Sequence, residues 1–145
     1  MTVYEKSPNG WSCLPTAFAI VLGVPVKNII DFLNHDGSEV LWPNLPEPRC
    51  RRSFHVQEVI NYCLANNYAV TESHRMLGLR PIGTNDVKTF ENPRYLDHMK
   101  YYNGVFTNEI HAFATLGGAV IDPASGSRFT GQIAIHHYFI VQQVA

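Results

Sequence analysis

The segment from Leu14 to Leu22 most constrains what this chain can fold into. It reads Leu-Pro-Thr-Ala-Phe-Ala-Ile-Val-Leu, with Pro15 near its start and Gly23 directly after its last residue. Proline in a first helical turn gives up no hydrogen bond and glycine often ends a helix, so the pattern predicts a short helix over 14–22. Because apolar residues occupy every side of it, we expect this helix to run through the middle of the domain.

A single core is expected around that helix. The 145 residues correspond to one domain, spanning 1–145, because domains commonly have about 100–200 residues. Hydrophobic residues make up 46% of the sequence, which is enough for a core. The formal net charge is −1, so no excess of positive charge is available to hold nucleic acid or an anionic membrane, and we expect neither as a partner.

The N-terminal residues and the cysteines point to the cytoplasm. The first eight residues contain no apolar run flanked by positive charge, as a secretory signal peptide would. The longest apolar run, Ala17 to Leu22, has six residues, whereas a membrane-spanning helix needs about 20. Cys13, Cys50 and Cys63 are an odd number of cysteines, which we interpret as thiols kept reduced in a cytoplasmic protein.

Two further helices follow from hydrophobic periodicity. Residues 26–34 carry apolar side chains on one face and end near Asn34. Residues 55–66 show the same spacing, with Ser53 as the expected N-cap. Cys63 belongs to the apolar face of this third helix and is expected to point into the core.

Strand patterns dominate the second half of the chain. The expected strands are 68–71, 103–107, 111–116, 119–122 and 137–144. Helices that come first and strands that follow are typical of an α+β fold with an antiparallel sheet rather than a parallel α/β fold. Residues 73–100 carry mixed signals, and the proline-containing loop over 35–52 has a length often associated with function.

Cys13 stands directly before the apolar helix. Unsatisfied N–H groups and the helix dipole favour negative charge at a helix start, so a thiolate would be stabilised there. Reactive cysteines occupy such positions, whereas a cysteine on an apolar face, such as Cys63, is inert. The alternative interpretation of Cys13 is a buried capping residue, since free cysteine is commonly buried.

A histidine and an aspartate are expected to meet on one hairpin. The Gly-Gly pair at 117–118 is typical of a two-residue hairpin turn, which would pair Ala114 with Ile121. Continued to the strand ends, this register places His111 and Asp122 on the same face as diagonal neighbours, about 7–8 Å apart between backbones. The alternatives are a core histidine and a turn aspartate.

Cys13, His111 and Asp122 together have the residue types of nucleophilic acyl transfer. A carboxylate bonded to one imidazole nitrogen fixes the tautomer, and the other nitrogen can deprotonate a thiol. We expect a cysteine-dependent hydrolase that attacks an amide, isopeptide or thioester carbonyl and forms an acyl-enzyme.

The same residues resemble the papain-like cysteine peptidases, and within them the small bacterial and phage proteins related to bacteriocin-processing peptidases. Residues 9–19, Asn-Gly-Trp-Ser-Cys-Leu-Pro-Thr-Ala-Phe-Ala, resemble that family's Cys-x-Pro nucleophile helix, and 111–114 and 121–123 resemble its His and Asp strands. The resemblance implies a papain-like α+β fold, with the nucleophile helix packed on a C-terminal antiparallel sheet. It implies Cys13 as nucleophile, His111 as base and Asp122 as orienting acid, with a protein or peptide substrate and no cofactor.

The oxyanion hole departs from the family pattern. The family's oxyanion-hole glutamine lies six residues before the cysteine, where this chain has Ser7. A tetrahedral intermediate needs two preorganised donors. We expect the Cys13 backbone N–H as one and the Asn9 side chain as the other, with the Trp11 indole N–H as a weaker candidate.

Other functions can use the same residues. The triad also serves deamidases and transglutaminases, and a papain-like domain can be an inactive binding or virion-associated module. A metal-dependent hydrolase using the tandem His136 and His137 is disfavoured, because no Cys-x-x-Cys or His-x-x-x-His spacing accompanies them. We therefore expect no metal.

Two remaining features have simpler interpretations. Cys50 lies in Arg-Cys-Arg-Arg over 49–52, where three guanidiniums favour a thiolate, but the basic trio is better interpreted as solvent-exposed or as binding an acidic substrate group. Tyr95, Tyr101 and Tyr102 are candidates for a substrate cleft or for the core.

Overall fold

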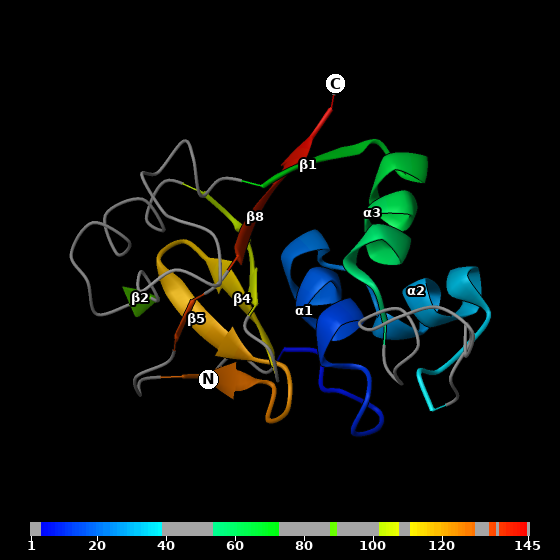
Figure 1. Cartoon of the computed structure of the whole chain (residues 1–145), viewed down its shortest axis with the longest axis horizontal. Helices are drawn as coiled ribbons and strands as arrows, with labels where there is room; N and C mark the ends of the chain where they lie inside the picture. The colour runs from blue at the N-terminus through cyan, green and yellow to red at the C-terminus, as the bar shows by residue number, and fades with distance from the viewer. Residues whose placement is uncertain are drawn as a thin grey trace.

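The computed structural model describes residues 4–38, 54–72, 102–107, 111–129 and 137–144, together with the backbone of 88–89 and 134–135. Three helices come first in the chain: α1 (Cys13–Leu22), α2 (Val26–Leu33) and α3 (Val56–Ala65). The strands are β1 (Tyr68–Glu72), β2 (Lys88–Thr89), β3 (Gly104–Thr107), β4 (Ala112–Leu116), β5 (Ala119–Asp122), β6 (Ser127–Arg128), β7 (Ala134–Ile135) and β8 (His137–Gln143). Figure 1 shows their arrangement.

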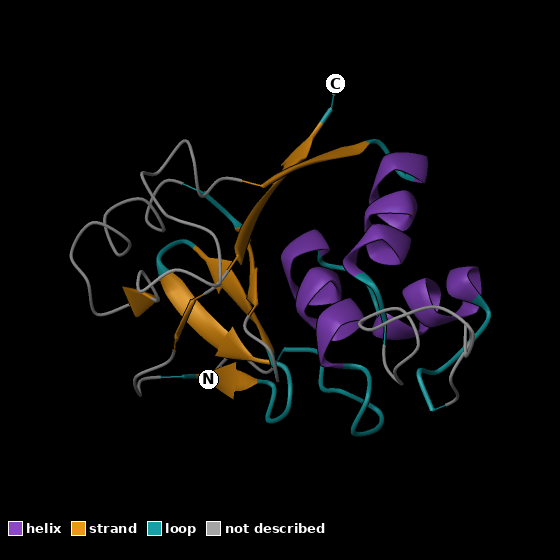
Figure 2. Cartoon of the chain, viewed as in Figure 1, coloured by secondary structure: helices purple, strands orange, loops and turns teal. Residues whose placement is uncertain are grey.

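The strands form an antiparallel sheet of six strands in the order β1-β8-β3-β4-β5-β6, and β2 pairs with β7 separately. Every neighbouring pair among them is antiparallel. The helices gather on one side of the six-stranded sheet (Figure 2). The predicted α+β class with an antiparallel sheet is therefore confirmed.

Helix α1 occupies the centre, as its composition predicts. Seven consecutive residues, Leu14 through Ile20, are buried, and the helix packs on β4 and β3 while also contacting α2 and α3. Gly23 ends it in the left-handed conformation, with φ of 71°. The helix begins at Cys13, one residue earlier than predicted, so the cysteine itself belongs to the first helical turn.

Helices α2 and α3 lie where they are predicted, but the cap of α3 is different. Helix α2 ends at Asn34, which adopts a left-handed conformation with φ of 62°. The N-cap of α3 is His55 and not Ser53, which lies outside the described residues. The Glu58 carboxylate accepts the His55 N–H at 2.9 Å, so a glutamate three residues into the helix selects the cap.

The hairpin of β4 and β5 has the predicted register. Ala114 pairs with Ile121, and the two turn glycines at 117–118 have φ of 57° and 87°. Positive φ at both central residues defines a type I′ turn, whose twist matches that of the flanking strands. The strand that carries Asp122 is thereby fixed against the strand that follows His111.

Both faces of the sheet are buried. Side chains from alternate positions, including Val105 and Ala114, join the helices in one core. On the opposite face Tyr138 is fully buried, and its hydroxyl is hydrogen-bonded to Thr115 Oγ1 at 2.7 Å and donates to the Tyr102 carbonyl at 3.1 Å. Burial raises the pKa of Tyr138 to about 12. Within the described ranges, no helix has the length and apolar character that crossing a bilayer requires.

Candidate active site

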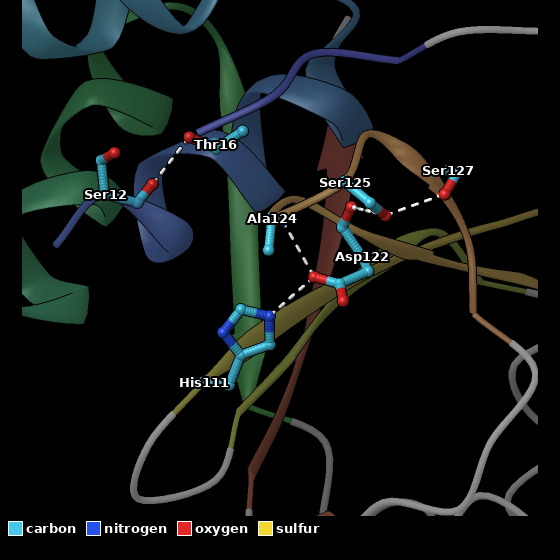
Figure 3. Close-up of polar contacts among 7 residues, drawn as sticks. All are labelled: Ser12, Thr16, His111, Asp122, Ala124, Ser125 and Ser127. Carbon is cyan, nitrogen blue, oxygen red and sulfur yellow. Dashed lines mark hydrogen bonds and ion pairs between the residues drawn. The ribbon is translucent and has the colours of Figure 1, made fainter. Parts of the chain in front are cut away.

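Cys13 is the first residue of α1 and carries a free, half-buried thiol. Ser12 before it is the N-cap, and its carbonyl accepts the Thr16 N–H at 3.1 Å and the Thr16 hydroxyl at 2.7 Å (Figure 3). These two bonds, together with the buried body of the helix, fix the backbone on which the thiol stands. The Cys13 N–H is one of the helix-start donors that have no acceptor within the helix.

His111 and Asp122 form a hydrogen-bonded pair. The His111 Nε2 and Asp122 Oδ1 atoms lie 2.7 Å apart, and the two side chains are 23% and 22% exposed. The same carboxylate oxygen accepts the Ala124 N–H at 2.9 Å, which fixes the orientation of the aspartate (Figure 3). The edge of the His111 ring meets the ring of Phe113, with centroids 4.6 Å apart. The imidazole is thus held from two sides.

Cys13 also acts on the imidazole, because its side chain raises the pKa of His111. Nε2 is bonded to Asp122, so a contact with the thiol would involve Nδ1. In Figure 3 one ring nitrogen points at Asp122, and the other points away from it, to the side where α1 begins. The structure therefore brings together the three residues that the sequence selects, from a helix start and two strand ends.

The hydrogen bond with Cys13 is the largest of the effects that raise the pKa of His111 to about 9. Desolvation acts in the opposite direction, and the Asp122 hydrogen bond and the charges of Cys13 and Asp122 add to the upward shift. These partners stabilise the protonated ring, so at neutral pH the imidazolium is favoured.

Asn9 is engaged with its surroundings. Its Nδ2 donates to the Asp36 carbonyl at 3.0 Å, and its Oδ1 accepts the Trp11 N–H at 2.8 Å. One of the two amide hydrogens is therefore used within the protein. The role of Asn9 as oxyanion-hole donor stays a prediction, as does the weaker candidacy of the Trp11 indole.

Ser7, six residues before Cys13, lies against the turn that follows Asp122. Its N–H donates to the Pro123 carbonyl at 2.8 Å, and its buried hydroxyl has no hydrogen-bond partner in the structure as described. Tyr4 continues this contact by donating its N–H to the Gly126 carbonyl at 3.1 Å. The N-terminal segment thus supports the turn beside the Asp122 carboxylate, a role that has no periodic signal in the sequence.

The remaining candidates lie elsewhere. Cys63 is fully buried, which confirms the prediction that it points into the core, and burial raises its pKa to about 12. His137 pairs with Glu72 between β8 and β1. Tyr102 contributes its carbonyl to the Tyr138 network. The candidates outside the described residues are Cys50 with its arginines at 49, 51 and 52, His136, Tyr95 and Tyr101.

The described residues contain no cluster of three His, Cys, Asp or Glu side chains that could hold a metal ion. Neither the protein-family models nor the curated proteins provide a match to this chain. The arrangement of a thiol, an imidazole and a carboxylate in one hydrogen-bonded series can generate a nucleophile and transfer its proton, as in other Cys-His-Asp systems.

Proposed function

We propose that this protein is a cysteine-dependent hydrolase, a peptidase or isopeptidase with a papain-like fold. Cys13 is the nucleophile, His111 the general base and acid, and Asp122 the orienting acid. The observation that carries the proposal is the hydrogen bond between His111 and Asp122 at 2.7 Å, and the effect of Cys13, which raises the pKa of His111, supports it. The placement of the cysteine at the start of the helix that packs on β4 supports the papain-like architecture.

The first half of the reaction forms an acyl-enzyme. The Cys13 thiolate attacks the carbonyl carbon, forming a C–S bond while the carbonyl electron pair moves to oxygen. When the tetrahedral intermediate collapses, the C–N bond breaks and the His111 imidazolium gives its proton to the leaving amine. The products of this half are a free amine and a thioester on Cys13.

The second half releases the acid. Neutral His111 removes a proton from water, the resulting hydroxide attacks the thioester, and the C–S bond breaks to return the thiolate. The imidazolium is then restored for the next cycle. Asp122 keeps its hydrogen bond to Nε2 throughout, so Nδ1 remains the nitrogen that exchanges protons with substrate and thiol.

Charge on the carbonyl oxygen requires donors near the nucleophile. The Cys13 backbone N–H has the position for one of them, since it lies at the helix start where the dipole also favours negative charge. We propose the Asn9 side chain as the second donor. A thiol nucleophile has to remain reduced, which agrees with the cytoplasm as the proposed compartment.

A covalent trap tests the proposal. The protein is incubated with a peptidyl chloromethyl ketone, which requires a thiolate and its neighbouring imidazole, and the modified residue is identified by mass spectrometry. We expect labelling of Cys13 in the wild type and in Cys63→Ala, and its loss in His111→Ala. Hydrolysis of peptide and isopeptide-linked fluorogenic substrates is then measured in the same variants. Labelling of a different residue, or labelling that persists in His111→Ala, would exclude the proposed site.

A further inference from the structure

The residues before Cys13 are held by a segment that follows α2. We call residues 9–12, directly before Cys13, the nucleophile loop. Residues 35–38 contact this loop through Asn9, whose Nδ2 donates to the Asp36 carbonyl at 3.0 Å. Asn9 in turn accepts the Trp11 N–H and, through its carbonyl, the Ser12 hydroxyl at 3.3 Å. A hydrogen-bonded route therefore joins the 35–38 segment to the residue next to the nucleophile.

The other side of the 35–38 segment is anchored on the start of α3. The His35 Nε2 and Glu58 Oε1 atoms lie 2.7 Å apart, with side chains only 11% and 16% exposed. The second oxygen of Glu58 accepts the N–H of the α3 cap, His55. The Gly37 N–H donates to His35 Nδ1 at 3.2 Å, so the proton of the ring is on Nε2 and is donated to Glu58.

Close packing supports the same placement independently of these hydrogen bonds. Gly37 has φ of +82°, and a Cβ atom at this position would lie 2.8 Å from a ring carbon of Phe54 and 3.0 Å from Trp11 Cβ. The backbone of the segment thus fits between the residue that precedes the α3 cap and the nucleophile loop. The His35 ring is stacked on Phe54 with centroids 4.4 Å apart, which adds to the anchor.

We infer that the 35–38 segment is a positioning element for Cys13, with Asn9 as the positioning residue that connects them. The inference rests on the proposed function, and it gives Asn9 a positioning role in addition to the proposed contact with the carbonyl oxygen. Helix α1 is fixed by its own burial, but the Asn9–Ser12 turn is exposed at Gly10 and Trp11. Its link to α3 fixes the backbone that sets the direction of the thiol toward His111.

Asn9→Ala is the direct test, and Gly10→Ala is its matched control. The control places an alanine at the next residue of the same turn, where nothing lies within 4 Å of the new Cβ. We expect Asn9→Ala to lower both turnover and the rate of Cys13 alkylation by iodoacetamide by about tenfold, because small misplacements of reacting groups cost up to about 10²-fold. The control is expected to stay within about twofold of the wild type.

The two readouts separate positioning from oxyanion stabilisation. Alkylation by iodoacetamide forms no oxyanion, so a donor to the substrate would change turnover and leave alkylation unchanged. That result would overturn the inference and leave Asn9 with the oxyanion role alone. Wild-type values of both rates in Asn9→Ala would also overturn it.

A double-mutant cycle with Glu58→Ala tests the whole route. If Glu58 and Asn9 act through one segment, the double variant alkylates no more slowly than the slower single variant, whereas independent effects multiply. Gln57→Ala is the control on the same helix, and Glu58→Gln keeps an acceptor if Glu58→Ala does not fold. Multiplying effects would contradict a shared route.

Failure of the proposed function is distinguishable from failure of this inference. If wild-type Cys13 reacts no faster than a free thiol and no substrate is turned over, the hydrolase proposal is wrong. Amide hydrogen exchange at Trp11 and Ser12 then still decides the positioning role. We expect faster exchange in Asn9→Ala than in Gly10→Ala, and equal rates would contradict the inference.

Discussion

The imidazole of His111 and the carboxylate of Asp122 meet across the ends of one β-hairpin, with Nε2 and Oδ1 2.7 Å apart. A type I′ turn sets the register of that hairpin, and the Ala124 N–H holds the carboxylate oxygen that faces the ring. The orientation of the base is therefore determined by local chain geometry. Tertiary packing is needed only to bring the Cys13 thiol next to His111.

Selective alkylation follows from the different surroundings of two thiols. Cys63 is fully buried, and this burial raises its pKa to about 12, so its thiol is both protonated at pH 7 and shielded from reagents. Brief treatment with iodoacetamide is expected to modify Cys13 and leave Cys63 unmodified, as read by peptide mass spectrometry. Unfolding in urea should equalise the two, which is the control. Predominant modification of Cys63 in the folded protein would contradict the assignment.

Asp122→Asn is expected to keep the fold and slow acyl transfer. The amide cannot stabilise the imidazolium, and its NH₂ group favours the wrong tautomer of His111; the comparable exchange in a serine protease lowers kcat about 10⁴-fold. A cysteine enzyme with a preformed ion pair is expected to lose less, on the order of 10²-fold or more. Turnover is measured beside the thermal midpoint, and Asp31→Asn on exposed α2 is the matched control. Wild-type turnover in Asp122→Asn would exclude Asp122 as the orienting acid.

The titration of His111 is expected to depend on Cys13. Its pKa of about 9 is raised chiefly by the hydrogen bond with Cys13, so Cys13→Ala should lower the pKa by about one unit or more, as followed by NMR of the ring protons. The raised value lies above the ordinary 6.5, so the ring contributes stability below pH 6.5 that is lost as the pH rises to about 9. Urea unfolding of the wild type between these pH values should show that loss, and Cys13→Ala should show less. An unchanged titration in the variant would mean that the two side chains do not interact.

Tyr138→Phe tests the opposite face of the sheet. Removing the hydroxyl takes away the hydrogen bonds with Thr115 and the Tyr102 carbonyl in a buried site, at a cost of about 1–3 kcal/mol in the free energy of unfolding. Tyr62→Phe is the control, since its hydroxyl has no hydrogen-bond partner in the part of the chain that the structure describes, and it should change little. Cys13 alkylation should be unaffected in both variants. A slower reaction in Tyr138→Phe would show that the two faces of the sheet are coupled.

Local patterns were sufficient for much of this site. The Gly-Gly turn and strict alternation of side chains placed His111 and Asp122 on one face, and the apolar run with its terminal glycine placed α1. Residue spacing could not predict that the Cys13 end of α1 lies beside His111, because that contact depends on how the helix packs on the sheet. The contact joins residues nearly a hundred positions apart.

The differences from expectation have a common cause. Ser53 has the residue type of an N-cap, but the helix begins at His55 because Glu58 reaches back to it and also contacts His35. The Asn9 amide looked available for a substrate, yet its partner is the carbonyl of Asp36, 27 residues away. Backbone carbonyls carry no sequence signature, so such partners become visible only when distant segments are placed together.

The burial of α1 links the reactivity of Cys13 to the global stability of the fold. An element with seven consecutive buried residues cannot fray or open by itself, so its amide protons should exchange only through global unfolding. Cys13, the proposed nucleophile, stands at the start of this buried helix, unlike sites that are carried on lids. Heat inactivation and loss of the folded state should therefore occur together. Because the buried helix tolerates little change, new substrate preferences would have to arise in the surrounding loops.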